Sequence, residues 1–356
     1  MKRTLVILLG CCLGLNSCYE LDLNPLSQAS SENWYSSETE IEMSVKDFYR
    51  DDFWPLDNED KTDNFIYRET PSEILKGTFN GQSDDVTKLW ANQYKSIARA
   101  NTILANMDKA VNMGISEVKL KQYEGEAFFQ RASCYARLVT YFGDVIYVTE
   151  VVDIDKAFTL GRTAKSEIVP KIYEDYDKAI ENLPEKYSGL SSQRATKGAA
   201  LALKARFALY MGDWDIVADA TKKCMDLGIY KLHKDYSDLF LSTTKNSEES
   251  IFLLPRSIEY KVTLGNWTVM NEVSRNPGGW GAFAPSWDLL AAYTCTDGLP
   301  IDESPLFDPH NPFKNRDPRC TATIVEFGTR HLGFEYNPHP DAVQVMNYNT
   351  GKMQKN

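Results

Sequence analysis

Apolar residues recur at three- and four-residue spacing over much of this chain, which is the pattern of amphipathic helices. In the segment 30–50, for example, Ile41, Val45, Phe48 and Tyr49 fall on one helical face. Ser116 at the start and Gly143 at the end of another segment are suitable cap residues, and Pro184 stops a third. The spacing predicts helices over residues 30–50, 84–111, 116–144, 165–184 and 196–228.

The last of these segments has an internal turn. Ala199, Leu203, Phe207 and Tyr210 form an apolar stripe, and "GDW" at 212–214 follows it directly. Gly212 suits a left-handed helix cap, and Asp213 suits the cap of a second helix. This is the tetratricopeptide pattern: an alanine-rich helix, a turn with the sequence Gly-Asp-aromatic, and a second helix that also contains alanine. Since one such unit cannot bury its apolar face alone, we expect several to stack into a superhelix.

Two long stretches lack this periodicity. Residues 51–84 form a loop-like segment with acidic and aromatic residues, and loops of this length are uncommon without a function. Beyond residue 250 the pattern predicts a short strand at 251–254, a loop over 255–284, a short helix and turn over 285–301, and a turn feeding a strand over 313–328. The predicted fold is therefore mainly α, with a tetratricopeptide-like scaffold at 30–250 and a loop-rich region at 251–356.

The N-terminus predicts export. Lys2 and Arg3 precede an apolar segment of eleven residues from Leu5 to Leu15, too short to span a bilayer. "LNSC" at 15–18 is similar to a lipobox, which predicts a signal peptide at 1–17, an acyl chain on Cys18 and a tether at 18–29. An ordinary cleaved secretory signal is the alternative.

Charge and motifs exclude several function classes. The net charge of −11 excludes nucleic acid as a partner, because that partner needs a basic surface. The four histidines lack metal-ligand spacing, and neither a GxSxG elbow nor a phosphate loop occurs, so we expect no catalytic residues and no cofactor. The acidic stretch 57–64 is either a weak calcium site or, as we expect, a solvated loop. A Cys295–Cys320 disulfide is left open.

Seven segments in order are similar to the SusD/RagB family of outer-membrane nutrient-binding lipoproteins. They are the lipobox with "LDLNP", "LWANQYKSIARANTIL", "RASCYARLVTYFGDVIYVTE", "EIVPKIYEDYDKAIENLP", "RATKGAALALKARFALYMGDW", "PSWDLLAAYTCTDGLPI" and "NRDPR". The resemblance implies a helical scaffold, a loop-rich face that binds oligosaccharides, a position as lid on a SusC-like TonB-dependent barrel, and no catalysis. Family members run longer and end in another helix, so we expect this chain to lack the usual C-terminal part.

Aromatic rings on loops are the expected platform for the apolar faces of sugars. Three tryptophans lie in the irregular stretches and are candidates either for glycan stacking or for loop packing: Trp54, Trp267 and Trp280. Tyr67 and Asn266 are weaker candidates. The four tryptophans at helical positions are expected in the core: Trp34, Trp90, Trp214 and Trp287.

Three functional hypotheses follow. The first is a lipid-anchored receptor in the outer membrane, facing the cell exterior, that passes an oligosaccharide to a SusC-like barrel. The second is a tetratricopeptide scaffold lipoprotein that binds a protein or peptide. The third is a glycan hydrolase, which would need paired carboxylates whose separation the sequence does not give.

Overall fold

The structure is a computed structural model of the 356-residue chain. It describes residues 34–55, 61–68, 70–189, 193–245, 247–254, 256–259, 261–275, 277–336, 344–346 and 353–355. Of residues 266, 267, 344–346 and 353–355 it describes the backbone alone. The predicted signal peptide, the tether and Cys18 lie outside the described residues.

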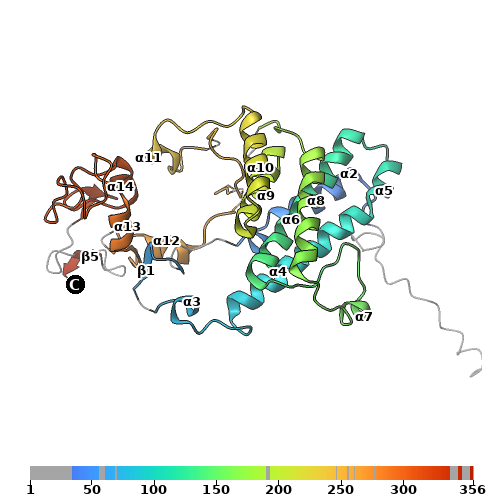
Figure 1. Ribbon diagram of the computed structural model, residues 1–356, viewed down its shortest axis with the longest axis horizontal. Coiled ribbons are helices and arrows are strands. Elements are labelled where there is room, and N and C mark those ends of the chain that lie inside the picture. Colours follow the sequence, from blue (N-terminus) through green and yellow to red (C-terminus); the bar gives the residue numbers. More distant parts are fainter. Residues whose placement is uncertain are drawn as a thin grey trace, which may run out of the picture.

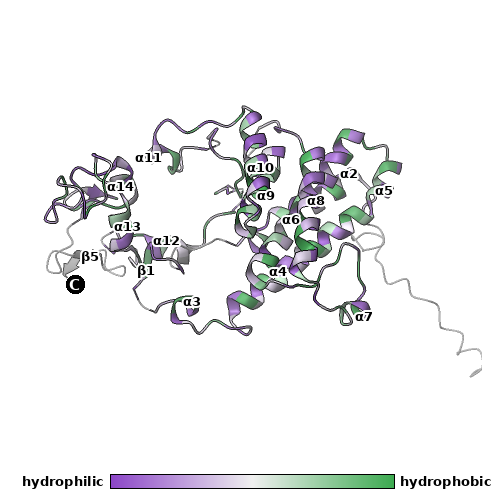
Figure 2. Ribbon diagram, viewed as in Figure 1, coloured by the Kyte–Doolittle hydropathy of each residue, from purple (hydrophilic) through white to green (hydrophobic). Residues whose placement is uncertain are grey.

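Five long helices form the scaffold, and each packs against its neighbour in the series (Figure 1). They are α4 (Asp84–Ala105), α6 (Glu117–Phe142), α8 (Lys165–Asn182), α9 (Lys197–Met211) and α10 (Trp214–Asp226). Shorter elements around them are α2 (Glu38–Lys46), η1 (Asp47–Tyr49), η2 (Asp51–Phe53), α5 (Met107–Asn112) and α7 (Ile154–Ala157). The predicted mainly α fold is confirmed. Helices α8 and α10 have separate apolar and polar faces, as the periodicity predicts (Figure 2).

The turn between α9 and α10 follows the predicted pattern with one difference. Thr196 caps α9 by accepting from the amide of Ala199, and Gly212 ends it with φ of +81°. Asp213 occupies the first position before α10, but its carboxylate makes no cap hydrogen bond. It accepts instead from the Tyr173 hydroxyl at 2.5 Å, which ties the turn to α8. The predicted cap role of Asp213 is therefore wrong.

The first helix is shorter than predicted. Residues 34–37 are bent rather than helical, and α2 begins after Ser37, whose hydroxyl accepts from the amide of Glu40. The Glu40 carboxylate accepts in return from the amide of Ser36 at 2.7 Å. Because these reciprocal hydrogen bonds satisfy free amides at the helix start, they set the boundary that spacing alone placed too early.

The stretch 51–84 is more ordered than a loop. It contains η2, strand β1 (Phe65–Tyr67) and α3 (Glu73–Lys76). Strand β1 pairs antiparallel with β2 (Phe283–Pro285), with Tyr67 opposite Phe283. This pairing joins an early segment of the chain to a late one and fixes where the C-terminal part is attached.

We define the C-terminal lobe as β1 together with residues 261–336, which lie at the opposite end of the molecule from α2 and α5 (Figure 1). Its elements are α12 (Asn266–Glu272), β2, α13 (Trp287–Ala292), α14 (Pro318–Thr323), β3 (Arg330–His331) and β4 (Phe334–Glu335). Helix α11 (Tyr236–Leu239) packs against α14 from the scaffold side. Two further strands, β5 (Gln344–Met346) and β6 (Met353–Lys355), pair with each other.

Two predictions for this region are wrong. Residues 251–254 form no strand; Ile251, Phe252 and Leu254 extend over the scaffold core instead. The segment after "NRDPR" begins with helix α14 rather than a strand, because Asp317 caps it and Pro318 occupies its first position. The short helix predicted before 301 is confirmed as α13. Cys295 and Cys320 are both buried and unpaired.

The "NRDPR" turn holds the lobe together. The buried Arg316 guanidinium donates to the carbonyls of Pro312 at 2.8 Å and Tyr293 at 2.6 Å, and also to that of Leu290. Asp317 pairs with Arg319, and hydrogen bonds from the Arg319 side chain lower the pKa of Asp317 to about 2. The cluster therefore has a structural role in the lobe.

Candidate ligand-binding site

The structure brings four of the five candidate residues into one small unit of the C-terminal lobe. Tyr67 lies on β1, with its ring 5.1 Å from that of Phe283 on β2. Asn266 and Trp267 lie in the first turn of α12. Trp280 follows α12 and donates its backbone N–H to the carbonyl of Met270 at 2.6 Å. No described contact tests whether any of them binds a sugar.

The turn that carries Trp280 depends on its glycines. A Cβ atom on Gly279 would lie 2.0 Å from the carbonyl oxygen of Val273, and Gly281 has φ of +52°. Backbone hydrogen bonds from Gly281 to Val273 and from Ala282 to Asn271 then run along the end of α12. The Trp280 ring stays 40% exposed beside this backbone. At Gly279 the space beside the glycine is therefore occupied by the backbone of the chain itself.

Trp54 has a different environment. Its ring is 7% exposed, lies 5.7 Å from that of Phe129 and 4.9 Å from that of Phe252, and its indole N–H donates to the carbonyl of Phe48 at 2.9 Å. Because Phe129 and Phe252 pack against this buried ring, it has no free face on which a sugar could stack. Of the two alternatives for Trp54, the structure therefore supports loop packing, and its assignment to ligand binding is corrected.

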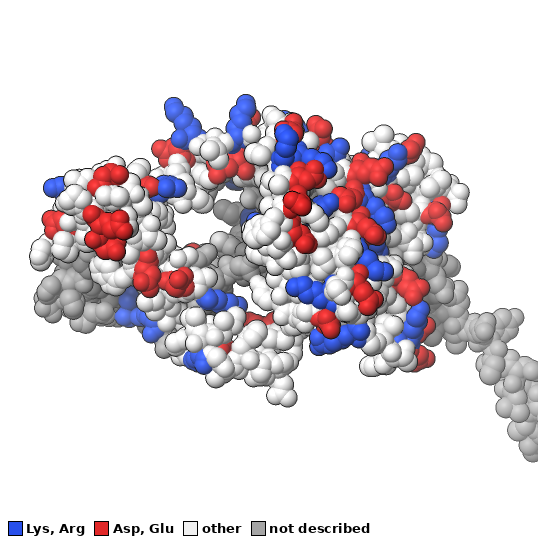
Figure 3. Space-filling model, in the orientation of Figure 1, with Lys and Arg blue, Asp and Glu red and all other residues white. Residues whose placement is uncertain are grey.

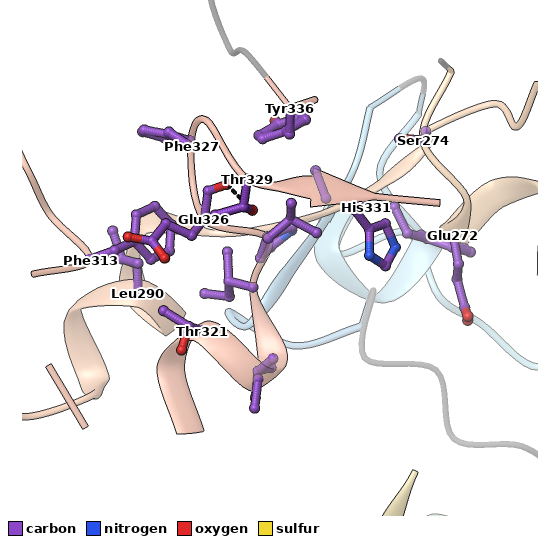
Figure 4. Close-up of a pocket in the computed structure, with 18 of the residues that line it drawn as sticks. Glu272, Ser274, Leu290, Phe313, Thr321, Glu326, Phe327, Thr329, His331 and Tyr336 are labelled. Carbon is purple, nitrogen blue, oxygen red and sulfur yellow. Dashed lines mark hydrogen bonds between the residues drawn. The ribbon is translucent and has the colours of Figure 1, made fainter. Parts of the chain in front are cut away.

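A cavity of about 1170 Å³ opens in the same lobe. The paired strands β1 and β2, helices α12, α13 and α14, and the β3–β4 hairpin all contribute to it (Figure 4). This volume exceeds the roughly 300–1,000 Å³ of most small-molecule sites. Its aromatic lining consists of Phe65, Phe283, Trp287, Phe313, Phe327, Phe334 and Tyr336. Polar groups interleave with these rings, among them Glu272, Thr321, Glu326 and His331 (Figure 4).

Trp287 is the aromatic residue of this cavity that the sequence placed wrongly. It was expected in the core, but its side chain is 70% exposed. It is the first residue of α13. The preceding Ser286 caps this helix, because its hydroxyl accepts from the amide of Leu289, and its own amide donates to the carbonyl of Asn64 at 2.8 Å. Because Asn64 immediately precedes β1, the early segment fixes the helix end that presents Trp287. Sequence spacing gave no signal of this pairing.

The other three tryptophans that were expected in the core differ in how exposed they are. Trp34 and Trp90 are half-buried against the scaffold; Trp34 donates to Ser44, and Trp90 contacts Tyr94 and Phe142. Trp214 is 67% exposed, so its assignment to the core is wrong. Like Trp287, it is the first residue of its helix, where the side chain projects beyond the packed face.

Metal binding gains no support from the described side chains. In that part of the chain no group of three His, Cys, Asp or Glu side chains is placed to hold an ion. The predicted acidic loop 57–64 lies partly outside the described residues, and its Lys61 pairs with Asp85 at 3.1 Å.

Comparison with known families decides the relationship. Residues 23–209 match the SusD-like family described as "Starch-binding associating with outer membrane", and residues 248–356 match the SusD family. This chain belongs to the SusD/RagB family. At family level, these descriptions support carbohydrate binding and association with the outer membrane.

Relatives agree with this placement. A SusD-like protein of Formosa agariphila is 30% identical over 49% of this chain and 32% of its own length, and a second from that organism is 25% identical over 71% and 52%. A SusD-like carbohydrate-binding protein from Bacteroides fragilis has a similar structure, with a TM-score of 0.76 and 26% identity over 87% of this chain and 64% of its own. The chain thus spans about a third to a half of these curated relatives. Within the described residues, no helix is long and apolar enough to cross a bilayer.

Proposed function

We propose that this SusD/RagB protein binds an oligosaccharide at the cell surface and passes it to a SusC-like TonB-dependent barrel. The observation that carries the proposal is the aromatic-lined cavity of about 1170 Å³ in the C-terminal lobe. Aromatic rings suit the CH faces of sugars, and the interleaved polar groups suit their hydroxyls. The volume supports a ligand of several sugar units rather than a monosaccharide.

Trp287→Ala is expected to weaken glycan binding by about tenfold, because stacking on an exposed ring contributes about 1 kcal/mol or more. Residues 19–356 are first screened against a polysaccharide panel by affinity electrophoresis, and the retarded glycan is then titrated by calorimetry. Trp214→Ala is the matched control, since it removes an equally exposed ring from the first residue of a scaffold helix. If wild type and Trp287→Ala bound the glycan with equal affinity, Trp287 would not be part of the binding site. Retardation by no glycan would overturn the function.

Delivery to a barrel requires a protein contact and an anchor. Exposed apolar side chains on the scaffold support such a contact: Phe158, 87% exposed beside α7, and Tyr210 and Trp214 at the α9–α10 turn. The second candidate function, a scaffold that binds another protein or peptide, rests on these same side chains.

The anchor and the barrel are tested in outer membranes of the producing cell. We expect the protein to co-purify with a TonB-dependent barrel and to incorporate a labelled fatty acid that Cys18→Ser removes, because two or more acyl chains give stable anchoring. Co-purification with a soluble protein in place of a barrel would favour the second candidate. A soluble, unlabelled wild type would contradict the lipoprotein assignment.

A further inference from the structure

The charged side chains of the cavity are unequally balanced. The lining has three carboxylates, two guanidinium groups and one histidine, of which Figure 4 labels Glu272, Glu326 and His331. The full set is Glu272, Arg275, Glu326, Arg330, His331 and Glu335. The carboxylates exceed the guanidinium groups by one charge.

The carboxylates are available to a ligand. Within the described residues, no hydrogen bond or ion pair occupies the side-chain oxygens of Glu272, Glu326 or Glu335. Of the two cations, Arg330 donates to the carbonyl of Gly333 at 3.2 Å, and within the described residues no hydrogen bond or ion pair occupies the Arg275 guanidinium. An unoccupied carboxylate accepts hydrogen bonds and has no donor to offer. The lining therefore has one more carboxylate than guanidinium groups.

The surrounding lobe strengthens this bias. Over residues 261–336 of the lobe the sequence has nine carboxylates and six Lys or Arg side chains. Asp317 and Arg319 pair with each other, so their charges cancel and eight carboxylates remain against five cations. Figure 3 shows acidic patches on the face of this lobe that it draws, with basic side chains beside them. A polyanion approaching the cavity would meet a field of its own sign.

We infer that the cavity selects glycans without carboxylate or sulfate groups. This inference rests on the proposed function and narrows its ligand class. Carboxylates such as Glu326 and Glu335 would accept hydrogen bonds from pairs of sugar hydroxyls, and such charge-assisted bonds are the stronger ones. The same side chains would repel a uronate or a sulfate ester placed against them.

Paired polysaccharides test this selection. Each neutral glycan is compared with its charged counterpart: methyl-esterified galacturonan with polygalacturonate, hydroxyethyl cellulose with carboxymethyl cellulose, and agarose with carrageenan. In affinity electrophoresis we expect residues 19–356 to be retarded by a neutral member and at least about tenfold less by its anionic counterpart. Any residual binding of the anionic member should strengthen with added salt, which screens the repulsion.

Variants locate the effect. Glu326→Gln/Glu335→Gln is expected to weaken binding of the neutral glycan about tenfold and to narrow the gap to its anionic counterpart. Glu303→Gln is the control, because it removes the same charge from an exposed position of the lobe outside the cavity lining. Equal or stronger binding of an anionic member, or an unchanged gap in the double variant, would overturn the inference and leave glycan binding intact. Binding of neither member of any pair would instead overturn the proposed function.

Discussion

Asp175→Ala is expected to lower the free energy of unfolding by about 3–5 kcal/mol, the usual effect of breaking a buried ion pair by removing one partner. The Asp175 carboxylate on α8 accepts two hydrogen bonds from Arg131 on α6, at 2.7 and 2.8 Å. Both side chains are only about 5% exposed. Without Asp175, the Arg131 charge stays in the interior with no anion to balance it.

The other contacts of Arg131 explain why a movement of its side chain cannot recover the lost stability. Its guanidinium also donates to Asn101 on α4 at 2.9 Å, and the Asn101 amide donates to the carbonyls of Val148 and Glu150. One charged group thus connects three helices and the segment after α6. A shift of Arg131 toward solvent would break these hydrogen bonds as well.

Urea unfolding followed by circular dichroism measures this effect on residues 19–356. Asp219→Ala is the control, because Asp219 pairs with Lys223 at 2.7 Å on the exposed surface of α10. Exposed helix pairs of this kind contribute about 0.3–0.5 kcal/mol. A loss below 1 kcal/mol in Asp175→Ala would contradict the role given to the buried pair.

Trp54→Ala is expected to destabilise the protein by a similar amount, about 3–5 kcal/mol, because it leaves a cavity among Phe129 and Phe252. The substitution also removes the contact with Arg137, whose guanidinium lies 4.5 Å from the ring centroid. We expect the same urea midpoints to reveal the loss, with glycan affinity unchanged in the fraction that stays folded.

Trp280→Ala provides the comparison for Trp54. Its ring is far more exposed, so its removal is expected to cost less than about 1 kcal/mol of stability. If Trp54→Ala were as stable as wild type and lost glycan binding, the assignment of Trp54 to packing would be wrong.

The scaffold was predictable from sequence because its information is local. Apolar spacing located each long helix, and Gly212 located the α9–α10 turn, since these signals act within a few residues. The pairing of β1 with β2 left no such signal. Strands of three residues are too short to show a period of two, and their partners lie far apart in sequence.

The candidate site, in contrast, could be predicted only in part. Tyr67, Trp267 and Trp280 were singled out because they lie in stretches without helical periodicity, and the structure places all three in the C-terminal lobe. Trp287 was misplaced because a first helical residue carries the same apolar signal whether it faces the core or solvent. Its exposure depends on how Ser286 and Asn64 orient α13, which is tertiary information.

The β1–β2 pairing also sets an order of events in folding. The Ser286 hydroxyl bonds to the carbonyl of Asp63, a partner 223 residues away. The scaffold helices depend on contacts between neighbours in sequence, so they form early. The contact between Ser286 and Asp63, in contrast, must bring together two residues that are far apart in the chain. The cavity that depends on it therefore forms only after residue 286 has been synthesised. Until then Phe65 and Tyr67 lie on a strand without a partner, the state in which a chain is most prone to mispair with another copy.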